Sequence, residues 1–267
     1  MPLEFYKNNM IKNPVNKSIS GTSKLKYSKG QYKRSNFRPN GVSIITCTNR
    51  LDYMENILNN YKSQIYNSKE LIIVLNKNSL ELERWKDYFK DIEEFKIFKL
   101  DENISLGECL NFGIKESEYN IIAKFDDDDY YSPKYLSESI KVFEYTDADV
   151  IGKSTTYVYF KKNKKLAIRN PRRENKYVYR VEGPTLIMKK RILDKIKFSN
   201  KSLGEDVQFC KDCYDNGIKI YSTDKYNHVY IRHGSTHNHT WGITDDYYMK
   251  LCDVIGKIEN YKNYVTK

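Results

Sequence analysis

The chain has 267 residues, 24 of them tyrosine, and a formal net charge of +11. Residues 1–40 hold nine Lys/Arg and one acid, so they carry +8, and the rest of the chain carries only +3. The charge therefore belongs to an arm, which argues against a nucleic-acid-binding body. Apolar runs all fall short of the ~18 residues that a membrane span needs. The five scattered cysteines argue against a disulfide scaffold. We expect a soluble, cytoplasmic protein.

Residues 1–38 are polar, basic and without apolar periodicity, as in "SISGTSKLKYSKGQYKRS". Such a composition predicts a flexible arm rather than a packed element. Basic segments of this kind are attracted to anionic lipid headgroups. We therefore expect the arm to allow peripheral contact with the inner face of a membrane.

From residue 41 onward, short apolar runs alternate with amphipathic helical patterns. The spacing predicts strands over 42–46, 70–76, 95–100 and 120–125, with helices over 52–66, 79–90 and 105–117. The first helix would bury Met54, Ile57, Leu58, Tyr61 and Ile65. This alternation indicates βαβ units and a parallel sheet covered on both faces. Ligands bind such sheets at the carboxyl ends of the strands.

The second half reads as a mixture of short strands and helices. Helices are predicted over 132–146, 189–197, 205–216 and 244–262, and strands over 149–170, 176–181, 218–223 and 228–233. Cys210 and Cys213 form a CxxC on the third of these helices. No second cysteine pair lies nearby, so we expect core residues rather than a redox or zinc site.

Four consecutive aspartates, Asp126 to Asp129, follow the strand predicted over 120–125 in "IIAKFDDDDYYSP". Carboxylates at a strand end suit a hard cation, Mg²⁺ or Mn²⁺. The alternative is a solvated acidic turn. Lys124 lies inside the apolar strand and needs a partner. It can neutralise the aspartates or point at a diphosphate.

Five motifs in this order and spacing resemble the family-2 inverting glycosyltransferases of GT-A fold over residues 41–235. They are "VSIITCTNR", "ELIIVLNKNS", "LGECLNFGI", "IIAKFDDDDYYSPKYL" and "GEDVQF". The resemblance implies an α/β fold with a Rossmann-like, mainly parallel sheet flanked by helices and a smaller, mixed acceptor-side sheet. It implies a nucleotide-sugar-binding half at 39–130 and an acceptor-binding half at 131–240, followed by a C-terminal helix at 241–267.

The resemblance also assigns roles to individual residues. Asp128 would be the direct metal ligand, assisted by Asp126, and His237 or His239 would be a further ligand. Asp206, next to Glu205, would be the general base, although both acids could equally be a helix cap. The donor would contact Thr46, Thr48, Asn76, Asn111, Lys124, Asp126 and Asp127.

The activity implied is transfer of one sugar from a nucleotide-diphosphate sugar, expected to be a UDP-sugar, with inversion and with Mn²⁺ or Mg²⁺. The acceptor would be a glycan, a lipid-linked sugar or a protein. Many members carry acids after the second strand, where this chain has Asn76, Lys77 and Asn78. The QxxRW motif of processive synthases is absent, which favours single-sugar transfer.

Two other function classes stay open. A sugar nucleotidyltransferase would need a glycine-rich loop after the first strand, and "TCTNRLD" has no glycine. A catalytically inactive GT-A binding protein is disfavoured by intact Asp128 and Asp206. The basic loop "RNPRREN" at 169–175 is either a solvated turn or a clamp over a phosphate or an anionic acceptor.

Overall fold

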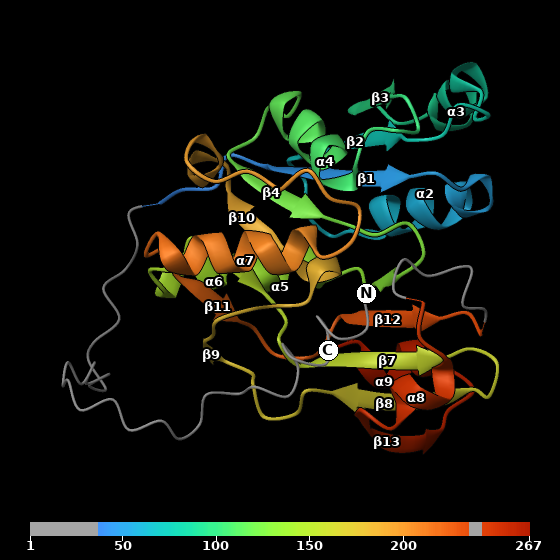
Figure 1. The fold of residues 1–267 in the computed structure, drawn as a ribbon, viewed down its shortest axis with the longest axis vertical. Helices are drawn as coiled ribbons and strands as arrows, with labels where there is room; N and C mark the ends of the chain where they lie inside the picture. The colour runs from blue at the N-terminus through green and yellow to red at the C-terminus, as the bar shows by residue number, and fades with distance from the viewer. Residues whose placement is uncertain (1–36, 235–241) are drawn as a thin grey trace. The chain divides into compact units, whose positions relative to one another are not determined.

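The computed structural model describes residues 37–234 and 242–267. They belong to one compact unit, Lys33–Lys267, that contains two sheets. The larger sheet has the strand order β3-β2-β1-β4-β10-β6-β11-β9, and the smaller has the order β13-β8-β7-β12-β5 (Figure 1). The α/β architecture expected from the sequence is therefore confirmed.

The four strands predicted in the first half are present and parallel: β1 Val42–Thr48, β2 Lys69–Leu75, β3 Phe95–Lys99 and β4 Ile121–Lys124. A 3-10 turn, η1 Leu51–Tyr53, and three helices connect them: α2 Met54–Ser63, α3 Leu82–Phe89 and α4 Leu106–Lys115. The side chain of Ser105 caps α4 by accepting the Glu108 N–H at 3.3 Å. Local signals thus fix where α4 begins.

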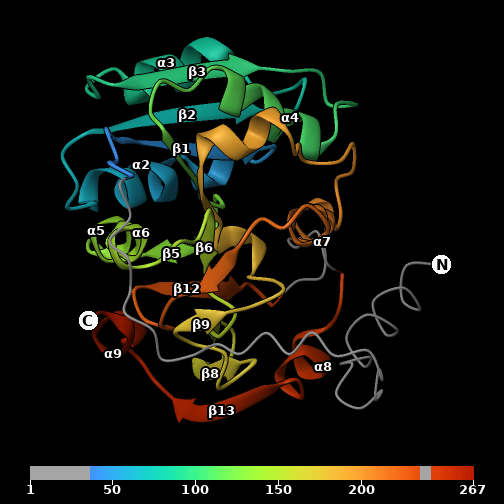
Figure 2. The same ribbon diagram turned by 90° about the vertical axis from the view of Figure 1, so that its left-hand side faces the viewer.

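The two faces of the larger sheet carry separate apolar cores. Residues of α2, α3, α5 (Tyr135–Ile140) and α6 (Val142–Tyr145) pack on one face. Residues of α4 and α7 (Glu205–Asp215) pack on the other, and Figure 2 shows α5 and α6 across the sheet from α7. Cys210 and Cys213 are buried in the second core, on α7. Ile65, expected in the core, is 63% exposed because α2 ends at Ser63.

The second half of the chain completes the larger sheet. β10 (Ile187–Lys189) runs antiparallel between β4 and β6 (Val150–Gly152). β11 (Ile220–Ser222) is parallel to β6, and β9 (Lys176–Tyr177) forms the far edge. The sheet is therefore mainly parallel and extends across the expected division near residue 130.

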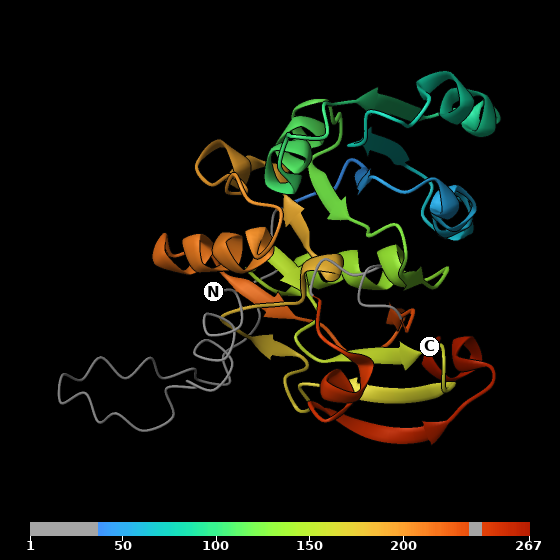
Figure 3. The ribbon, with the colours of Figure 1, turned by 45° about the vertical axis from the view of Figure 1, so that its right-hand side comes forward.

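The smaller sheet is mixed, as expected. It contains β5 Tyr130–Tyr131, β7 Thr156–Phe160, β8 Lys165–Arg169, β12 His228–Arg232 and β13 Cys252–Lys257. β12 and β7 are parallel, and the other pairs are antiparallel. Figure 3 shows this sheet with the dark red strand β13 at its edge.

The predicted C-terminal helix is wrong. Residues 244–262 form α8 Asp245–Met249, then strand β13, and α9 Tyr261–Val265 follows. Two β-branched residues, Val254 and Ile255, favour a strand there, and the open edge of β8 offers backbone partners. Tertiary pairing overrides the helical pattern.

Two other predicted helices are also changed. A helix was predicted over 189–197. Instead, β10 ends at Lys189, and the 3-10 turn η3 Lys190–Asp194 follows it. The helix predicted from residue 132 starts only at Tyr135 and is split into α5 and α6. A third 3-10 turn, η2, covers Gly183–Thr185.

Within the part of the chain that the structure describes, every helix is too short or too polar to cross a lipid bilayer. The predicted basic arm lies outside the described residues except for its last two, Phe37 and Arg38. His237 and His239 also lie outside them.

Candidate active site

The candidate site begins where β1 and β4 end side by side. Ile45 of β1 is in register with Lys124 of β4, so the residues that follow both strands meet at one edge of the sheet. Thr48 ends β1, and its hydroxyl donates to Asp127 Oδ2 at 2.5 Å. The Asn76 N–H donates to Thr48 O at 2.8 Å, which brings the end of β2 to the same edge. The topology expected from the sequence thus positions the aspartates as predicted.

Arg50 is the main cation beside the second and third aspartates. Its guanidinium forms ion pairs with Asp127 and, at 3.0 Å, with Asp128. Both carboxylates are nearly buried, at 4% and 9% exposure. Burial and the repulsion of Asp129 and Asp127 raise the pKa of Asp128 well above its ordinary value, and Arg50 only partly offsets this. The cluster is therefore short of positive charge.

Asp129 faces away from this group and into the protein. It is 1% exposed, and its Oδ2 lies 3.1 Å from Nε2 of His228. The Ile231 N–H donates to its Oδ1 at 3.0 Å. Asp129 therefore fixes the turn after β4 to strand β12.

Lys124, which lies inside β4, forms an ion pair with the first aspartate of the run. Its ammonium pairs with Asp126, and its side chain is 6% exposed. Burial lowers the pKa of Lys124, but Asp126, Glu205 and Asp206 outweigh burial and hold the pKa above its ordinary value. Lys124 thus pairs with the aspartate run, and its charge is also stabilised by the acids of α7.

Glu205 and Asp206 occupy the first turn of α7, after Gly204 in the left-handed conformation (φ 78°). Burial, followed by the repulsion of Asp206, raises the pKa of Glu205 to about 7. Burial also raises the pKa of Asp206, although Lys124 and Arg180 act in the opposite direction. A carboxylate whose pKa is raised toward neutrality is better able to accept a proton.

The backbone of Gly183 lies close against the side chain of Asp206. A Cβ at this glycine would lie 2.6 Å from Asp206 Oδ2 and 3.0 Å from its Cβ and Cγ. Residue 183 begins the turn η2, which immediately precedes β10. The position of Asp206 therefore depends on a side-chain-free residue opposite it.

The donor atoms present fit a divalent cation by type. Asp126 and Asp128 offer carboxylate oxygens, which Mg²⁺ and Mn²⁺ prefer. Three carboxylates, Asp126 to Asp128, pair with two basic side chains, Arg50 and Lys124, which leaves negative charge that such an ion would offset. Across residues 37–234 and 242–267, His, Cys, Asp and Glu do not form a metal-binding group of three or more. An ion here would therefore need ligands beyond the described residues or from a substrate.

A cavity of about 320 Å³ adjoins Asp128. It lies between α2, β5, β7, β12 and α9, and its lining includes Asp52, Tyr53, Tyr159, His233 and Tyr261. Asp128 is thus reachable from a space large enough for part of a small molecule.

The remaining predicted residues lie in different settings. Thr46 is 2% exposed inside β1. The amide of Asn76 donates to Asp101 O at 2.8 Å and joins the ends of β2 and β3. Both polar groups of Asn111 are taken by the backbone of Phe198, at 2.8 and 3.0 Å. A donor-binding role for Asn111 stays a prediction, and these bonds do not favour it.

Sequence reasoning missed Arg50 and Gly183. Arg50 could have been found, because it is the basic residue that directly follows β1 and the aspartates need a cation at that edge. Gly183 carries no such signal, since its contact with Asp206 joins segments distant in sequence.

The sequence of this chain is similar to those of known proteins. The family model described as glycosyl transferase family 2 matches residues 43–197. A glucosyl-dolichyl phosphate glucuronosyltransferase of Haloferax volcanii is 28% identical over 115 residues, which cover 42% of this chain and 37% of that protein. A poly-beta-1,6-N-acetyl-D-glucosamine synthase of Staphylococcus aureus is 30% identical over 101 residues, covering 37% and 24%. The match thus spans only about a quarter to two fifths of these curated relatives.

Two solved structures share the fold. S. aureus TarS 1–349 superposes with a TM-score of 0.58 at 19% identity, covering 72% of this chain and 60% of that one. The mannosyltransferase PcManGT of Pyrobaculum calidifontis, in complex with GDP-Man and Mn²⁺, gives 0.59 at 16% identity, covering 77% and 61%. At these identities the likeness establishes the architecture alone.

Proposed function

Because the chain belongs to glycosyl transferase family 2, we propose that it transfers one sugar from a nucleoside-diphosphate sugar to an acceptor hydroxyl, with inversion at the anomeric carbon. The observation that carries this proposal is the arrangement around Lys124. Its ammonium pairs with Asp126 of the strand-end cluster, and Glu205 and Asp206 of α7 also stabilise its charge. A donor-binding edge and a candidate base thus act on one buried cation.

Asp206 is the proposed general base. An acceptor hydroxyl has a pKa far above neutrality, so a carboxylate within hydrogen-bond reach must take its proton as the new bond forms. Glu205, whose pKa of about 7 leaves it partly protonated at neutral pH, adds no full second charge beside it. A single displacement of this kind inverts the anomeric carbon.

Asp128 and Asp126 would hold the divalent ion, with His237 or His239 as a further ligand. When bound, Mn²⁺ or Mg²⁺ stabilises the charge that develops on the leaving diphosphate. Arg50 holds Asp127 and Asp128 in place through its ion pairs. Thr48 orients Asp127 through its hydroxyl.

The donor class follows from the relatives. S. aureus TarS has been solved with UDP-GlcNAc and with UDP, and PcManGT with GDP-Man and Mn²⁺. We propose a UDP-sugar for this chain, with Asn76 among the residues at the base-binding end. The named relatives act on different acceptors, so the family alone does not select one.

The test is hydrolysis of a panel of UDP- and GDP-sugars with Mn²⁺ and with EDTA, because slow transfer to water needs no acceptor. We expect one donor to be hydrolysed in Mn²⁺ and the rate to collapse in EDTA. A protein that binds these nucleotides without hydrolysing any donor would be a binding protein. Release of pyrophosphate from a nucleoside triphosphate and a sugar phosphate would instead make it a nucleotidyltransferase.

A further inference from the structure

Three arginines lie on the segment that leads from β8 to Gly183, the residue whose backbone lies against Asp206. Arg172 and Arg173 are exposed in the loop 169–175, and Arg180 follows four residues after Lys176, where β9 begins. We propose that these arginines bind an anionic group, a phosphate or a carboxylate, that the acceptor carries near its reacting hydroxyl. This inference rests on the proposed glycosyl transfer and adds the chemical class of the acceptor.

Arg180 is positioned by the packing of its neighbours on α7. The rings of Tyr179 and Tyr214 lie 4.9 Å apart, and Val181 is buried in the same core as Cys210. The Arg180 side chain keeps 29% of its surface exposed. Its pKa is raised by Glu182 and also by Asp206, so its guanidinium lies in the field of the proposed base while remaining open to solvent.

Glu182 neutralises Arg180 only in part. It pairs with Arg180 at 3.7 Å, but it also pairs with a buried cation. Arg169, 4% exposed, lies 3.5 Å from Glu182, and the Asn170 amide donates to the same oxygen at 2.9 Å. Burial would raise the pKa of Glu182, but Arg169, Arg180 and Arg173 together lower it. The glutamate is therefore ionised and shared among the cations around it.

The loop 169–175 carries positive charge that is not balanced by an ion pair in the described part of the chain. No carboxylate of the described residues lies within ion-pair distance of Arg172 or Arg173. Arg173 and Arg180 both lower the pKa of Glu182, so the loop and Arg180 share one electrostatic environment. The loop thus offers two guanidinium groups, those of Arg172 and Arg173, that an anionic ligand could neutralise.

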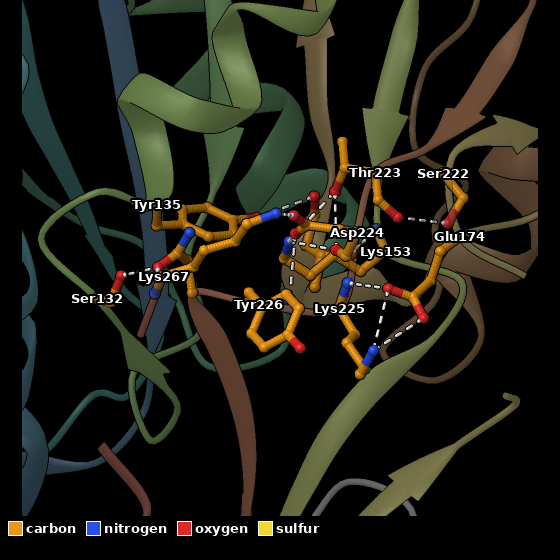
Figure 4. Close-up of polar contacts among 12 residues, drawn as sticks. Ser132, Tyr135, Lys153, Glu174, Ser222, Thr223, Asp224, Lys225, Tyr226 and Lys267 are labelled. Carbon is orange, nitrogen blue, oxygen red and sulfur yellow. Dashed lines mark hydrogen bonds and ion pairs between the residues drawn. The ribbon is translucent and has the colours of Figure 1, made fainter. Parts of the chain in front are cut away.

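The loop is held in a defined shape. The Thr155 hydroxyl donates to Asn170 O at 2.6 Å and accepts the Arg173 N–H at 3.0 Å. Glu174 accepts the Lys225 N–H at 2.8 Å, and Figure 4 shows this anchor beside Lys153 and Asp224. Arg172 adopts φ 66°, a left-handed conformation that is costly for a residue with a side chain. The anchors at Asn170, Arg173 and Glu174 and the strain at Arg172 favour a built site over a solvated turn.

The charge balance of the reaction points the same way. The donor diphosphate, Asp206 and the aspartate run are all negative, so they would repel an anionic acceptor unless cations stood beside it. Guanidinium groups bind phosphate and carboxylate through paired N–H donors. Arg172, Arg173 and Arg180 supply such donors on the segment 169–183, which reaches Asp206 at Gly183.

The first experiment measures binding of inorganic phosphate by calorimetry to protein saturated with Mn²⁺ and UDP, so that the diphosphate position is filled. We expect binding to the wild type and a loss of about tenfold or more, as for hydrogen bonds to charged groups, in Arg180→Gln and in the double variant Arg172→Gln/Arg173→Gln. Arg84→Gln, an exposed arginine on α3, is the matched control and should bind as the wild type does. Absence of phosphate binding in the wild type, or equal loss in the control, overturns the proposal.

The second experiment separates the two anions. Octyl glucoside, its 6-phosphate and octyl glucuronide are added to the donor that the wild type hydrolyses, and nucleotide release above the acceptor-free rate is recorded. Stimulation by the phosphate or the uronate that the arginine variants lose supports the inference. Stimulation by the neutral glycoside alone overturns it.

We expect acceptor-free hydrolysis by the wild type, and the control Arg84→Gln should hydrolyse the donor at the same rate. This acceptor-free reaction therefore separates a failure of the anion-binding inference from a failure of the proposed sugar transfer. Hydrolysis that is absent from the wild type contradicts the proposed transferase itself.

Discussion

His228 Nε2 lies 3.1 Å from Asp129 Oδ2, and both side chains are buried at 1% exposure or less. Burial lowers the pKa of His228 to about 3, so its ring is neutral at physiological pH. Burial also raises the pKa of Asp129. The contact joins the end of β4, in the larger sheet, to β12, in the smaller one. The fourth aspartate thus braces the turn that presents the other three.

Removal of this brace should destabilise the fold. Asp129→Ala leaves His228 and the Ile231 N–H without their buried partner, and each unsatisfied group costs about 1–3 kcal/mol. We expect urea denaturation to show a free energy of unfolding lower by about 2–5 kcal/mol. Asp129→Asn keeps an oxygen for Ile231 and should lose less. Equal losses in the two variants would contradict the role assigned to the oxygen.

Asp128 should control the metal dependence of nucleotide binding. In the wild type we expect calorimetric affinity for UDP to be at least about tenfold higher with Mn²⁺ than with EDTA, as for a metal that shares its coordination with phosphate. Asp128→Ala should remove most of this difference. Asp52→Ala is the matched control, since this exposed acid lines the same cavity. Identical affinities in Mn²⁺ and EDTA for the wild type would rule out the metal site.

The first half of the fold could be read from the sequence because its signals are local. The apolar β-branched runs of β1 and β2 are buried on both faces, and periodic helices separate them. The positions of Asp128 after a strand and of Asp206 at a helix start were predicted from the local pattern, while their roles were taken from the family resemblance and stay proposals. In each case a few neighbouring residues carry the signal.

Other parts depend on contacts between distant segments. Strand β13 forms only because β8 offers an edge about 85 residues earlier in the chain, so its sequence alone was read as a helix. The brace between Asp129 and His228 spans 99 residues. The aspartate run alone could not show that one of its members faces inward, because that depends on where β12 lies.

Glu205 should make folding stability depend on pH. Its pKa rises from 4.5 to about 7 on folding, so between these values the folded chain holds more protons than the unfolded one. Stability therefore falls as pH rises through this window, by up to about 3 kcal/mol. Glu205→Gln should be more stable than the wild type at pH 8 and similar near pH 4.5 in urea denaturation. Glu83→Gln, at an exposed site, should show no such trend, and a pH-independent gain in Glu205→Gln would refute the shift.

Gly183→Ala tests the contact that positions Asp206. The added Cβ would lie 2.6 Å from Asp206 Oδ2, so the carboxylate or the turn must move. We expect kcat to fall while calorimetric affinity for UDP stays near the wild-type value, because the nucleotide is held at the strand ends. The melting temperature serves as the control for general misfolding. Wild-type turnover in a stable Gly183→Ala protein would show that the glycine is not needed there.

Asp206→Asn removes the proposed base and keeps its size. The amide cannot accept the hydroxyl proton, and a placed general base contributes typically ~10²–10⁴-fold in rate. Turnover should therefore fall by about that factor, and by more than in Gly183→Ala, where a carboxylate remains. Donor affinity should change little, because Asp206 would act on the acceptor. Preserved turnover with lost donor binding would instead make Asp206 a donor-binding residue, and the base would then be sought at Glu205, which lies beside it in the first turn of α7.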